Sequence, residues 1–416
     1  MTTLETMGEK AKAAARQLGA CSGADRNRAL EAMADALMER LAELLAANRR
    51  DVERAELSGM APAMVDRLRL TEERVRGMAQ GIRDTRGLAD PVGEVVEGRR
   101  LENGLRISKV RVPMGVIGII YEARPNVTSD AAALCLKAGS AVILRGGKEA
   151  FESNVAVTRA MQAGLRAAGL PSDAVQLVED TSRETATQMM RLNRYIDLLI
   201  PRGGAGLIRT VVENATVPVI QTGVGNCHIY VDESADPSMA AAITVNAKAS
   251  RPSVCNAAET LLIHRTAAPR MLPAIAAGLR EKQVRLRCCG RAAALLPDIE
   301  TEPASEEDWG TEYLDYILAV RVVDSLEEAM EHIARYGTGH SECIVTESYE
   351  NAEKFTAGVD AAAVYVNAST RFTDGGVFGL GAEIGISTQK LHARGPMGLR
   401  ELTTVKFIVN GSGQIR

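Results

Sequence analysis

Residues 116–147, VIGIIYEARPNVTSDAAALCLKAGSAVILRGG, contain two short apolar runs with a helical stretch between them. The runs Val116–Tyr121 and Ala141–Leu144 predict strands, because they are short, continuous and rich in β-branched residues. Gly146 and Gly147 then follow the second run, as in a strand-to-helix turn. A strand, a helix and a further strand in succession indicate an α/β fold with a parallel sheet.

The same alternation continues along the chain. Further candidate strands are Val175–Val178, Tyr195–Ile200, Val217–Ile220 and His228–Val231, with a helix from Ser153 to Ala168. Parallel sheets of this kind carry helices on both faces and bind ligands beyond the carboxyl ends of their strands.

A second α/β region follows residue 232. Its expected elements are a helix over 237–249, a strand at Glu259–His264, a helix over 269–280, and a strand–helix succession from Leu318 to Val366. After the glycine-rich segment Gly375–Gly381, the pattern predicts one more helix and then a terminal strand, Thr403–Val409.

The region before residue 90 is expected to be helical. Apolar residues recur at helical spacing from Arg26 until the breaker Ser58-Gly59, with Asp25 as the expected N-cap. Thr71 is expected to cap another helix, because acidic residues follow in its first turn.

Residues 94–112 predict a β-hairpin. Two β-patterned runs, Glu94–Val96 and Leu105–Val112, flank the dipeptide Asn103-Gly104. Asn-Gly is the strongest short hairpin signal, because both residues tolerate a positive φ.

Composition argues against several classes of protein. The chain has 416 residues, of which 46% are hydrophobic and 25% charged, as is typical of globular proteins. A net charge of −4, without a basic stripe, argues against nucleic-acid binding. The sequence has no apolar run of membrane-spanning length and no signal-peptide pattern after Met1. We therefore expect a cytoplasmic protein with no membrane partner.

The seven cysteines are odd in number and irregularly spaced, which favours reduced thiols over a disulfide framework. No paired CxxC motif is present, so we expect no metal site. Cys135 is expected on a helix face, and Cys288 and Cys289 at the surface or in loops.

Two glycine-rich turns follow predicted strands. One contains Arg145, Gly146, Gly147 and Lys148, and the other is Pro201–Gly206. Glycines at such a turn let backbone N–H groups approach a phosphate at the helix N-terminus. Neither turn has the GxGxxG or P-loop form, so a phosphate site and a tight turn with solvated charges both stay open.

Cys255 is the best candidate for a nucleophile. Pro252 and Ser253 break the preceding helix, so Cys255 is expected at a turn before a strand. Lys248 and Arg251 make its surroundings electropositive, which favours the thiolate. From these residues alone, a structural cysteine remains the alternative.

Four segments in chain order resemble those of one enzyme family: VPMGVIG (112–118), YEARPNVT (121–128), GNCHIYVD (225–232) and RPSVCN (251–256). They resemble the gamma-glutamyl phosphate reductases, the glutamate-5-semialdehyde dehydrogenases of proline biosynthesis, a branch of the aldehyde dehydrogenase superfamily. The resemblance extends from near residue 4 to the ending Lys406–Gly411. It implies NADPH-dependent reduction of L-glutamyl 5-phosphate to L-glutamate 5-semialdehyde with release of phosphate.

By this resemblance, Cys255 attacks the acyl phosphate, and the resulting thioester accepts a hydride from NADPH. Asn126 matches the asparagine that stabilises the oxyanion together with the backbone N–H of the nucleophile. The alternative for Asn126 is a turn residue after Pro125.

One departure from the wider superfamily concerns its water-activating glutamate. The matching stretch here is Gln221–Val224, and glutamine cannot accept a proton from water. A reductase must protect its thioester from hydrolysis, so the loss of this base suits the implied reaction.

The resemblance implies NADPH/NADP⁺ as the cofactor. Arg145 aligns with the superfamily's lysine at the adenosine ribose, and Lys148 stands where NAD-preferring members often have glutamate. Gly203 and Gly204 are the expected neighbours of the pyrophosphate, although the superfamily's Gly-Ser-x-x-x-Gly form is missing. Glu312 resembles the glutamate that holds the nicotinamide ribose; an exposed loop carboxylate is the alternative.

The implied substrate, glutamyl 5-phosphate, carries a phosphate and an α-carboxylate, so it needs cationic or hydrogen-bonding partners. The candidates are Arg124, Asn226, His228, Lys248, Arg251 and Arg371. Each has a structural ion pair or hydrogen bond as its alternative role.

The expected fold class is α/β and aldehyde-dehydrogenase-like. It comprises a Rossmann-type cofactor domain (1–93 and 113–223, with 385–402 returning to it), an α/β catalytic domain (224–384) and a small β oligomerisation element (94–112 and 403–416). This element implies a homo-oligomer, at least a dimer by strand exchange. Transient contact with glutamate 5-kinase is a further expectation.

Two other functions stay open at the level of sequence. One is a CoA-dependent acylating aldehyde dehydrogenase, which also lacks the water-activating base. The other is a catalytically silent, NADP-binding assembly subunit, against which the presence of Cys255 argues.

Overall fold

The computed structural model describes residues 3–416; Met1 and Thr2, where the predicted cofactor domain begins, lie outside it. The chain forms two compact units. Unit 1 comprises the chain up to Thr222 together with Gly379–Gly385 and Met397–Arg416, and unit 2 comprises Gly223–Phe378 and Ile386–Pro396.

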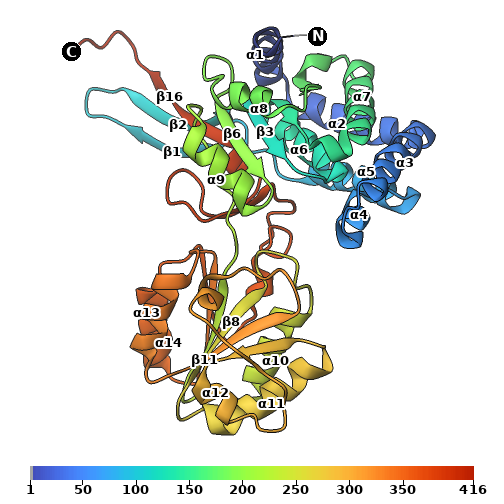
Figure 1. The fold of residues 1–416 in the computed structure, drawn as a ribbon. Helices are drawn as coiled ribbons and strands as arrows, with labels where there is room; N and C mark the ends of the chain where they lie inside the picture. The colour runs from blue at the N-terminus through green and yellow to red at the C-terminus, as the bar shows by residue number, and fades with distance from the viewer. Residues whose placement is uncertain (1–2) are drawn as a thin grey trace. The chain divides into compact units, whose positions relative to one another are not determined.

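Five helices open unit 1 (Figure 1), in agreement with the helical prediction: α1 (Leu4–Ala20), α2 (Gly23–Glu39), α3 (Leu41–Leu57), α4 (Pro62–Leu68) and α5 (Glu72–Gly87). Thr71 caps α5 as expected. The helix expected from Arg26 to Ser58 is divided at Arg40 into α2 and α3. Ser22, rather than Asp25, is the N-cap of α2. Asp25 completes a capping box by accepting a hydrogen bond from the Ser22 N–H at 3.0 Å.

The sheet of unit 1 is parallel, with the order β5-β4-β3-β6. Its strands are β3 (Val116–Tyr121), β4 (Ala141–Arg145), β5 (Val175–Leu177) and β6 (Leu198–Arg202), and its helices are α6 (Pro125–Lys137), α7 (Phe151–Ala167), α8 (Arg183–Met190) and α9 (Ala205–Asn214). The strand expected at Val217–Ile220 is wrong, because only an isolated bridge between Val219 and Leu199 forms. Pro218 has no N–H to donate to a ladder.

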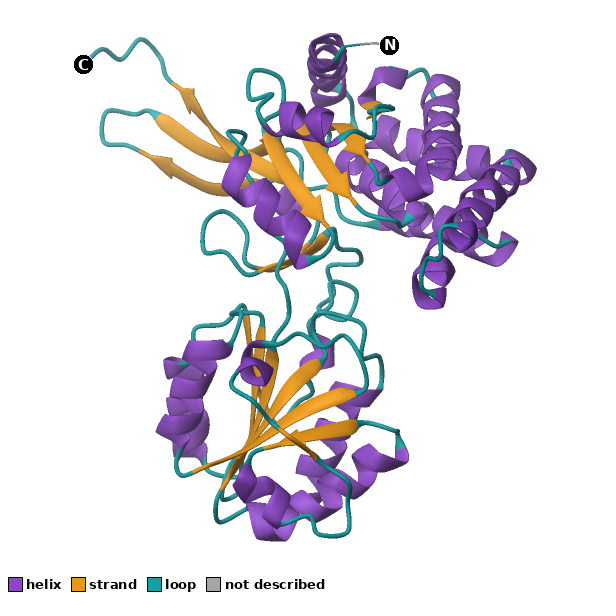
Figure 2. Cartoon of the chain, viewed as in Figure 1, coloured by secondary structure: helices purple, strands orange, loops and turns teal. Residues whose placement is uncertain are grey.

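A separate three-stranded antiparallel sheet also belongs to unit 1, with the order β1-β2-β16 (Figure 2). β1 (Val95–Arg100) and β2 (Arg106–Pro113) form the predicted hairpin, and Gly104 has a φ of 88° in its turn. β16 (Thr403–Asn410) pairs with β2 from the other end of the chain. Every residue of β1 is exposed, as is every residue of β16 after Thr403.

The helix expected between the glycine-rich segment and β16 is wrong. The chain forms two short paired strands there, β14 (Gly385–Ser387) and β15 (Gly395–Met397), and a short 3₁₀ turn at Arg400–Leu402. Gly385 and Gly395 have φ angles of 144° and 86°, which a helix does not permit.

The sheet of unit 2 has seven parallel strands in the order β10-β9-β11-β8-β7-β12-β13. The strands are β7 (Cys227–Val231), β8 (Ala258–His264), β9 (Arg285–Cys288), β10 (Glu302–Pro303), β11 (Ile317–Val323), β12 (Ser341–Val345) and β13 (Ala363–Val366). The helices are α10 (Pro237–Ala249), α11 (Ala268–Glu281), α12 (Gly290–Ala294), α13 (Leu326–Tyr336) and α14 (Tyr349–Gly358).

Alternate residues of these strands face two separate cores. Ile229 and Leu261 pack with α10, α11 and α12 on one face, whereas Tyr230 and Leu262 pack with α13 and α14 on the other. Figure 1 shows the helices on both sides of the sheet. The predicted second α/β region is therefore confirmed as a doubly wound sheet.

The predicted position of Cys288 is wrong. It was expected at the surface or in a loop, but it is buried in β9 within the first of these cores, because the short run 285–288 forms a strand. All seven cysteines are reduced thiols in the described part of the chain. No helix within residues 3–416 is both long and apolar enough to cross a membrane.

Candidate active site

Cys255 lies in the turn between α10 and β8 of unit 2. Helix α10 ends at Ala249, and Pro252 cannot continue it because proline has no N–H to donate. The Ala257 N–H bonds to the Val254 carbonyl at 3.0 Å and closes the turn. Cys255 is half-buried there, so the predicted turn before a strand is confirmed.

Gly225 lies directly against the backbone of Cys255. A Cβ atom at position 225 would lie 1.5 Å from the carbonyl oxygen of Cys255, so only glycine fits. The Cys227 thiol donates to the same carbonyl oxygen at 3.2 Å. The sequence segments 225–232 and 251–256 therefore meet at the Cys255 backbone.

Glu312 is joined to Cys255 through this glycine. The Gly225 N–H donates to Oε1 of Glu312 at 2.8 Å, while Gly225 also contacts Cys255. Burial raises the pKa of the Glu312 carboxyl, although the Gly225 N–H and the charge of Lys248 oppose the shift. The structure thus brings the expected nucleophile and the expected ribose-binding carboxylate together.

Arg371 and Arg251 supply positive charge near the Cys255 thiol. Burial lowers the pKa of Arg371, the neighbouring charge of Arg251 lowers it further, and the thiol of Cys255 acts in the opposite direction. Arg371 is held by a hydrogen bond from its Nε to Oγ of Ser250 at 3.1 Å. Cationic neighbours stabilise a thiolate, so these surroundings favour the ionised nucleophile.

Asn256 ties the Cys255 turn to the segment that carries Arg371. Its Nδ2 donates to the Thr373 carbonyl at 2.8 Å, and its own carbonyl accepts from Oγ1 of Thr370 at 2.7 Å. The position of the arginine relative to the thiol is therefore fixed by hydrogen bonds on both sides.

Asn226 and His228, expected as substrate partners, are fully buried instead. Nδ2 of Asn226 donates to the carbonyls of Trp309 and Tyr336, each at 2.8 Å. His228 Nδ1 lies 2.9 Å from Oε2 of Glu342, with both side chains closed to solvent. These protein contacts hold the start of β7 beside Cys255, which is the structural role that the sequence left open for both residues.

Lys248 is also buried, and its partner is a carboxylate of the protein. Its Nζ lies 2.5 Å from Oε2 of Glu259, and neither side chain is exposed. Burial lowers the pKa of Lys248 and raises that of Glu259, because each charge loses hydration, while the ion pair opposes both shifts. Oε1 of Glu259 accepts from the Leu314 N–H at 3.3 Å, so the pair supports the loop that contains Glu312.

Asn126 and Arg124 lie at the start of α6 in unit 1. Arg124 is the N-cap and Pro125 the first helical residue, where a missing N–H costs nothing. Both Asn126 and Arg124 are exposed. Nδ2 of Asn126 donates to Oδ2 of Asp130 at 3.0 Å, one helical turn further on.

Arg145 and Lys148 follow the carboxyl end of β4. Nη2 of Arg145 donates to the carbonyls of Thr181 and Ser182 at 2.6 and 3.1 Å, and burial lowers its pKa. Its buried Nε has no hydrogen-bond partner among residues 3–416. Lys148 is exposed at the start of the 3₁₀ turn Lys148–Ala150.

Gly203 and Gly204 precede α9 and already hold an anion. Oε2 of Glu122 accepts from the Gly204 N–H at 2.9 Å. A Cβ atom at position 203 would lie 2.7 Å from the Glu122 carboxylate. The expected pyrophosphate neighbours thus cradle a carboxylate from the end of β3, as expected of backbone amides at a helix N-terminus.

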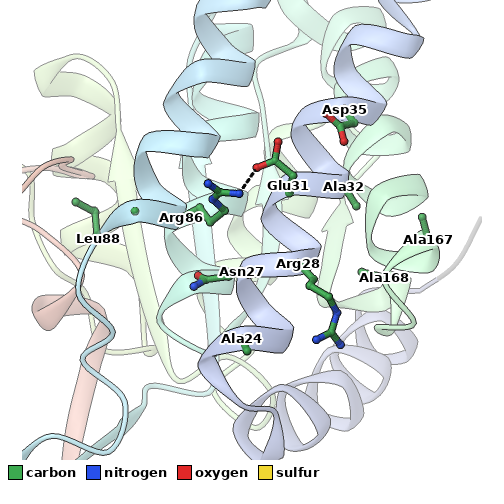
Figure 3. Close-up of a pocket in the computed structure, with 11 residues that line it drawn as sticks. Ala24, Asn27, Arg28, Glu31, Ala32, Asp35, Arg86, Leu88, Ala167 and Ala168 are labelled. Carbon is green, nitrogen blue, oxygen red and sulfur yellow. Dashed lines mark hydrogen bonds and ion pairs between the residues drawn. The ribbon is translucent and has the colours of Figure 1, made fainter.

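A separate groove of about 950 Å³ lies between α2 and the ends of α5 and α7 (Figure 3). Arg86 and Glu31, which form an ion pair at 2.7 Å, line it together with Asn27 and Arg28. None of the predicted site residues lines this groove.

Sequence reasoning missed the acidic partners of the site: Glu122, Asp130, Glu259 and Glu342. Of these, only Asp130 had a local signal, its spacing of four residues from Asn126 on a predicted helix. Within residues 3–416, no group of three or more His, Cys, Asp or Glu side chains could hold a metal ion.

Comparison with known proteins identifies the family. The model of the aldehyde dehydrogenase family matches residues 2–286. A gamma-glutamyl phosphate reductase from Moorella thermoacetica is 61% identical over 413 residues, which cover 99% of this chain and 98% of that protein. The chain belongs to the gamma-glutamyl phosphate reductases of the aldehyde dehydrogenase family. It is therefore an oxidoreductase, as predicted, and the family implies a nicotinamide cofactor.

Other relatives agree with this assignment. The gamma-glutamyl phosphate reductase of Clostridium beijerinckii is 59% identical, with all of both chains covered. The crystal structure of the Thermotoga maritima reductase has a TM-score of 0.97 and 51% identity, again over all of both chains. An acetylating aldehyde dehydrogenase from Geobacillus thermoglucosidasius, at a TM-score of 0.71 and 19% identity, covering 99% of this chain and 97% of its own, shares the fold. The predicted aldehyde-dehydrogenase-like fold is confirmed.

Proposed function

We propose that the chain reduces L-glutamyl 5-phosphate to L-glutamate 5-semialdehyde with NADPH, releasing phosphate, as the second step of proline biosynthesis from glutamate. The observation that carries this proposal is the Cys255 turn, which is fixed by Gly225 and flanked by Arg251 and Arg371. Relatives named for this activity support the choice of substrate.

In this reaction the Cys255 thiolate attacks the acyl carbon. The C–S bond forms, the C–O bond to the phosphoryl group breaks, and phosphate leaves with the electron pair. NADPH, when bound, supplies the hydride for the thioester carbon. The C–S bond then breaks, which releases the semialdehyde and regenerates the thiolate.

Both additions place negative charge on the carbonyl oxygen of the substrate. We assign Nδ2 of Asn126 and the backbone N–H of Cys255 as the donors that stabilise it. The loss of one such donor typically costs about 10²–10³-fold in rate.

For the cofactor, the chain offers Arg145 and Lys148 after β4. The unpartnered Nε of Arg145 and the exposed ammonium of Lys148 fit a phosphorylated ribose, and Lys148 favours NADPH over NADH by its charge. Glu312 fits a ribose hydroxyl, whereas Gly203 and Gly204 can meet a pyrophosphate only if it replaces the Glu122 carboxylate.

For the substrate, the exposed or half-buried Arg124, Arg251 and Arg371 remain the clamp candidates. A phosphate and an α-carboxylate both suit the planar guanidinium group, which can donate two parallel hydrogen bonds. Gln221 in place of a general base leaves water without activation, which protects the thioester.

We further assign the sheet of unit 1 with α6–α9 to the cofactor and unit 2 to catalysis, and the β1-β2-β16 sheet to homo-oligomerisation. Apolar side chains such as Val95, Phe407 and Val409 are exposed on these strands, at 61%, 61% and 54%. An edge strand with exposed apolar side chains is a template for pairing with another chain. Transient contact with glutamate 5-kinase in the cytoplasm would limit the exposure of the acyl phosphate to water.

The test is the reverse reaction, the phosphate-dependent reduction of NADP⁺ with glutamate 5-semialdehyde. Wild type should turn over, Cys255→Ala should lose at least about 10³-fold in kcat, and Cys21→Ala, which changes a thiol at the end of α1 in unit 1, should retain wild-type rates. Turnover that requires coenzyme A instead of phosphate would overturn the proposal. Full activity in Cys255→Ala would remove Cys255 from it.

A further inference from the structure

We propose that Asp130 is a positioning residue that fixes the orientation of the Asn126 amide, so that one N–H of Nδ2 is kept for the substrate's carbonyl oxygen. The inference rests on the proposed role of Asn126 as an oxyanion donor. It adds a residue that neither sequence motifs nor the family comparison singles out.

The two side chains lie on the same face of α6, four residues apart. Oδ2 of Asp130 accepts from Nδ2 of Asn126 at 3.0 Å. The backbone of Asn126 is held as well, because its carbonyl accepts from Oγ of Ser129 at 2.9 Å. Both the main chain and the amide group of Asn126 are therefore tied to the first turns of the helix.

Helix α6 itself is anchored at this end. The hydroxyls of Tyr121 and Thr128 lie 2.7 Å apart, and Thr128 donates to Oδ1 of Asn154 on α7 at 3.1 Å. All three side chains are buried. Asp130 thus acts on Asn126 from a rigid support.

The chemistry of the pair decides which way the amide faces. An ionised carboxylate only accepts hydrogen bonds, so it selects the NH₂ group of Asn126 and turns Oδ1 away. One N–H then points to Asp130 and the second remains for an oxyanion. Without Asp130 the amide can rotate and present Oδ1, which repels a negative oxygen.

Other groups around Asp130 keep this role compatible with neutral pH. Burial raises the pKa of Asp130 to about 6, while the Asn126 and Ser129 hydrogen bonds and the charge of Arg202, at the end of β6, lower it. The carboxylate form therefore predominates above pH 7.

The test compares Asp130→Ala with Asp130→Asn, in the wild-type and Asn126→Ala backgrounds. We expect Asp130→Ala to lower kcat about 10-fold, with the KM of the semialdehyde and of NADP⁺ unchanged, because only transition-state stabilisation is lost. Asp130→Asn, which keeps an acceptor oxygen but also offers a donor, should lose less. In the Asn126→Ala background both changes should have less than about a 2-fold effect.

A matched control lies on α5, where Nε2 of Gln80 donates to Oδ1 of Asp84 at 2.8 Å with the same spacing of four residues. Asp84→Ala removes an exposed pair of the same spacing on a helix that carries no proposed site residue, and it should leave kcat unchanged. An equal loss of kcat in both backgrounds would overturn the positioning role. A small effect of Asn126→Ala alone would instead remove the proposed oxyanion donor, so the two failures are distinguishable.

Discussion

Around Cys255 in unit 2, several candidate side chains are buried and held by other groups of the protein, whereas Asn126 and Lys148 of unit 1 are exposed to solvent. Asn226, His228 and Lys248 are buried and bonded to neighbouring backbone or carboxylate groups. In unit 1, Asn126 and Lys148 are exposed, and Asn126 has one side-chain partner among the described contacts.

This difference matches the different requirements of a nucleophile and of groups that bind a ligand. A nucleophile needs a fixed backbone and fixed neighbouring charges, since small displacements of a reacting atom are costly in rate. Groups that receive a ligand need unsatisfied donors at the surface. Changes to the buried residues of unit 2 should therefore act first on stability and geometry, and a change of Lys148 in unit 1 on cofactor preference.

The largest expected effect is on stability, from breaking the buried ion pair of unit 2. Glu259→Gln leaves the Lys248 ammonium buried without its counter-charge and should lower the free energy of unfolding by about 3–5 kcal/mol. Urea denaturation measures this. Glu72→Gln, which breaks the exposed pair with Arg76, should cost less than about 0.5 kcal/mol. Equal losses of unfolding free energy in the two variants would contradict the difference expected between the buried and the exposed ion pair.

Gly225→Ala should lower kcat/KM about 100-fold, because the new methyl group overlaps the Cys255 carbonyl and displaces the nucleophile. Steady-state kinetics and thermal unfolding should both detect the change. The control is Gly81→Ala on α5, where nothing lies within 4 Å of the added Cβ atom. That variant should be as active as wild type and slightly more stable, since alanine favours a helix.

The buried polar groups of unit 2 also predict a pH dependence. Burial, together with the charges of His228, Arg321 and Arg335, lowers the pKa of His332 to about 3. Because the unfolded histidine titrates near 6.5, the unfolded state binds more protons below that pH. This contribution of His332 to stability is fully present above about pH 6.5 and falls by about 2 kcal/mol between pH 7 and pH 5, whereas the raised pKa values of Glu259 and Asp130 act in the opposite direction over the same range.

Urea titrations at several pH values measure this slope. Relative to wild type, His332→Gln should lose about 2 kcal/mol less stability between pH 7 and pH 5. An identical change in stability from pH 7 to pH 5 in wild type and in His332→Gln would contradict the assignment.

In unit 1, Lys148→Glu should shift the ratio of kcat/KM for NADPH over NADH by about 10-fold toward NADH, because a carboxylate repels the 2′-phosphate. Lys282→Glu, an equivalent charge reversal at an exposed position of unit 2, should leave the ratio unchanged. An unaltered ratio in Lys148→Glu would show that another residue selects the cofactor.

The smallest effect is expected from Gln221→Glu. A carboxylate can accept a proton from water, so the variant should release a few-fold more glutamate by hydrolysis of the thioester than wild type. The products of semialdehyde oxidation, with and without phosphate, report the partition. Gln17→Glu on α1 serves as the control. An unchanged ratio of hydrolysis to phosphorolysis in Gln221→Glu would contradict the protective role of Gln221.

The sequence predicts those parts of the fold that depend on residues close together in the chain. The continuous β-branched run of β3 and the proline after α10 act locally, so the strand and the Cys255 turn follow from them. The prediction of a helix before β16 was wrong, because the spacing of apolar residues carries no information about the positive φ angles of Gly385 and Gly395.

The roles of several candidate site residues could not be predicted, because they depend on partners that are distant in the sequence. The role of Lys248 depends on Glu259, 11 residues away, and that of His228 on Glu342, 114 residues away. The local sequence around a cationic residue looks the same whether the residue binds an anionic ligand or a buried carboxylate of the protein. Only the fold distinguishes the two cases.

The Glu122 carboxylate at the start of α9 has a consequence for anion binding at that helix. Because the Gly204 N–H already donates to the Glu122 carboxylate, a phosphate that bound at this helix terminus would have to exchange with that carboxylate. The net free energy of such an exchange is the difference between two similar interactions, and so it is small even when each is strong. If the cofactor's pyrophosphate binds there as proposed, such a helix terminus would also release it readily, because the Glu122 carboxylate can return to the same N–H group.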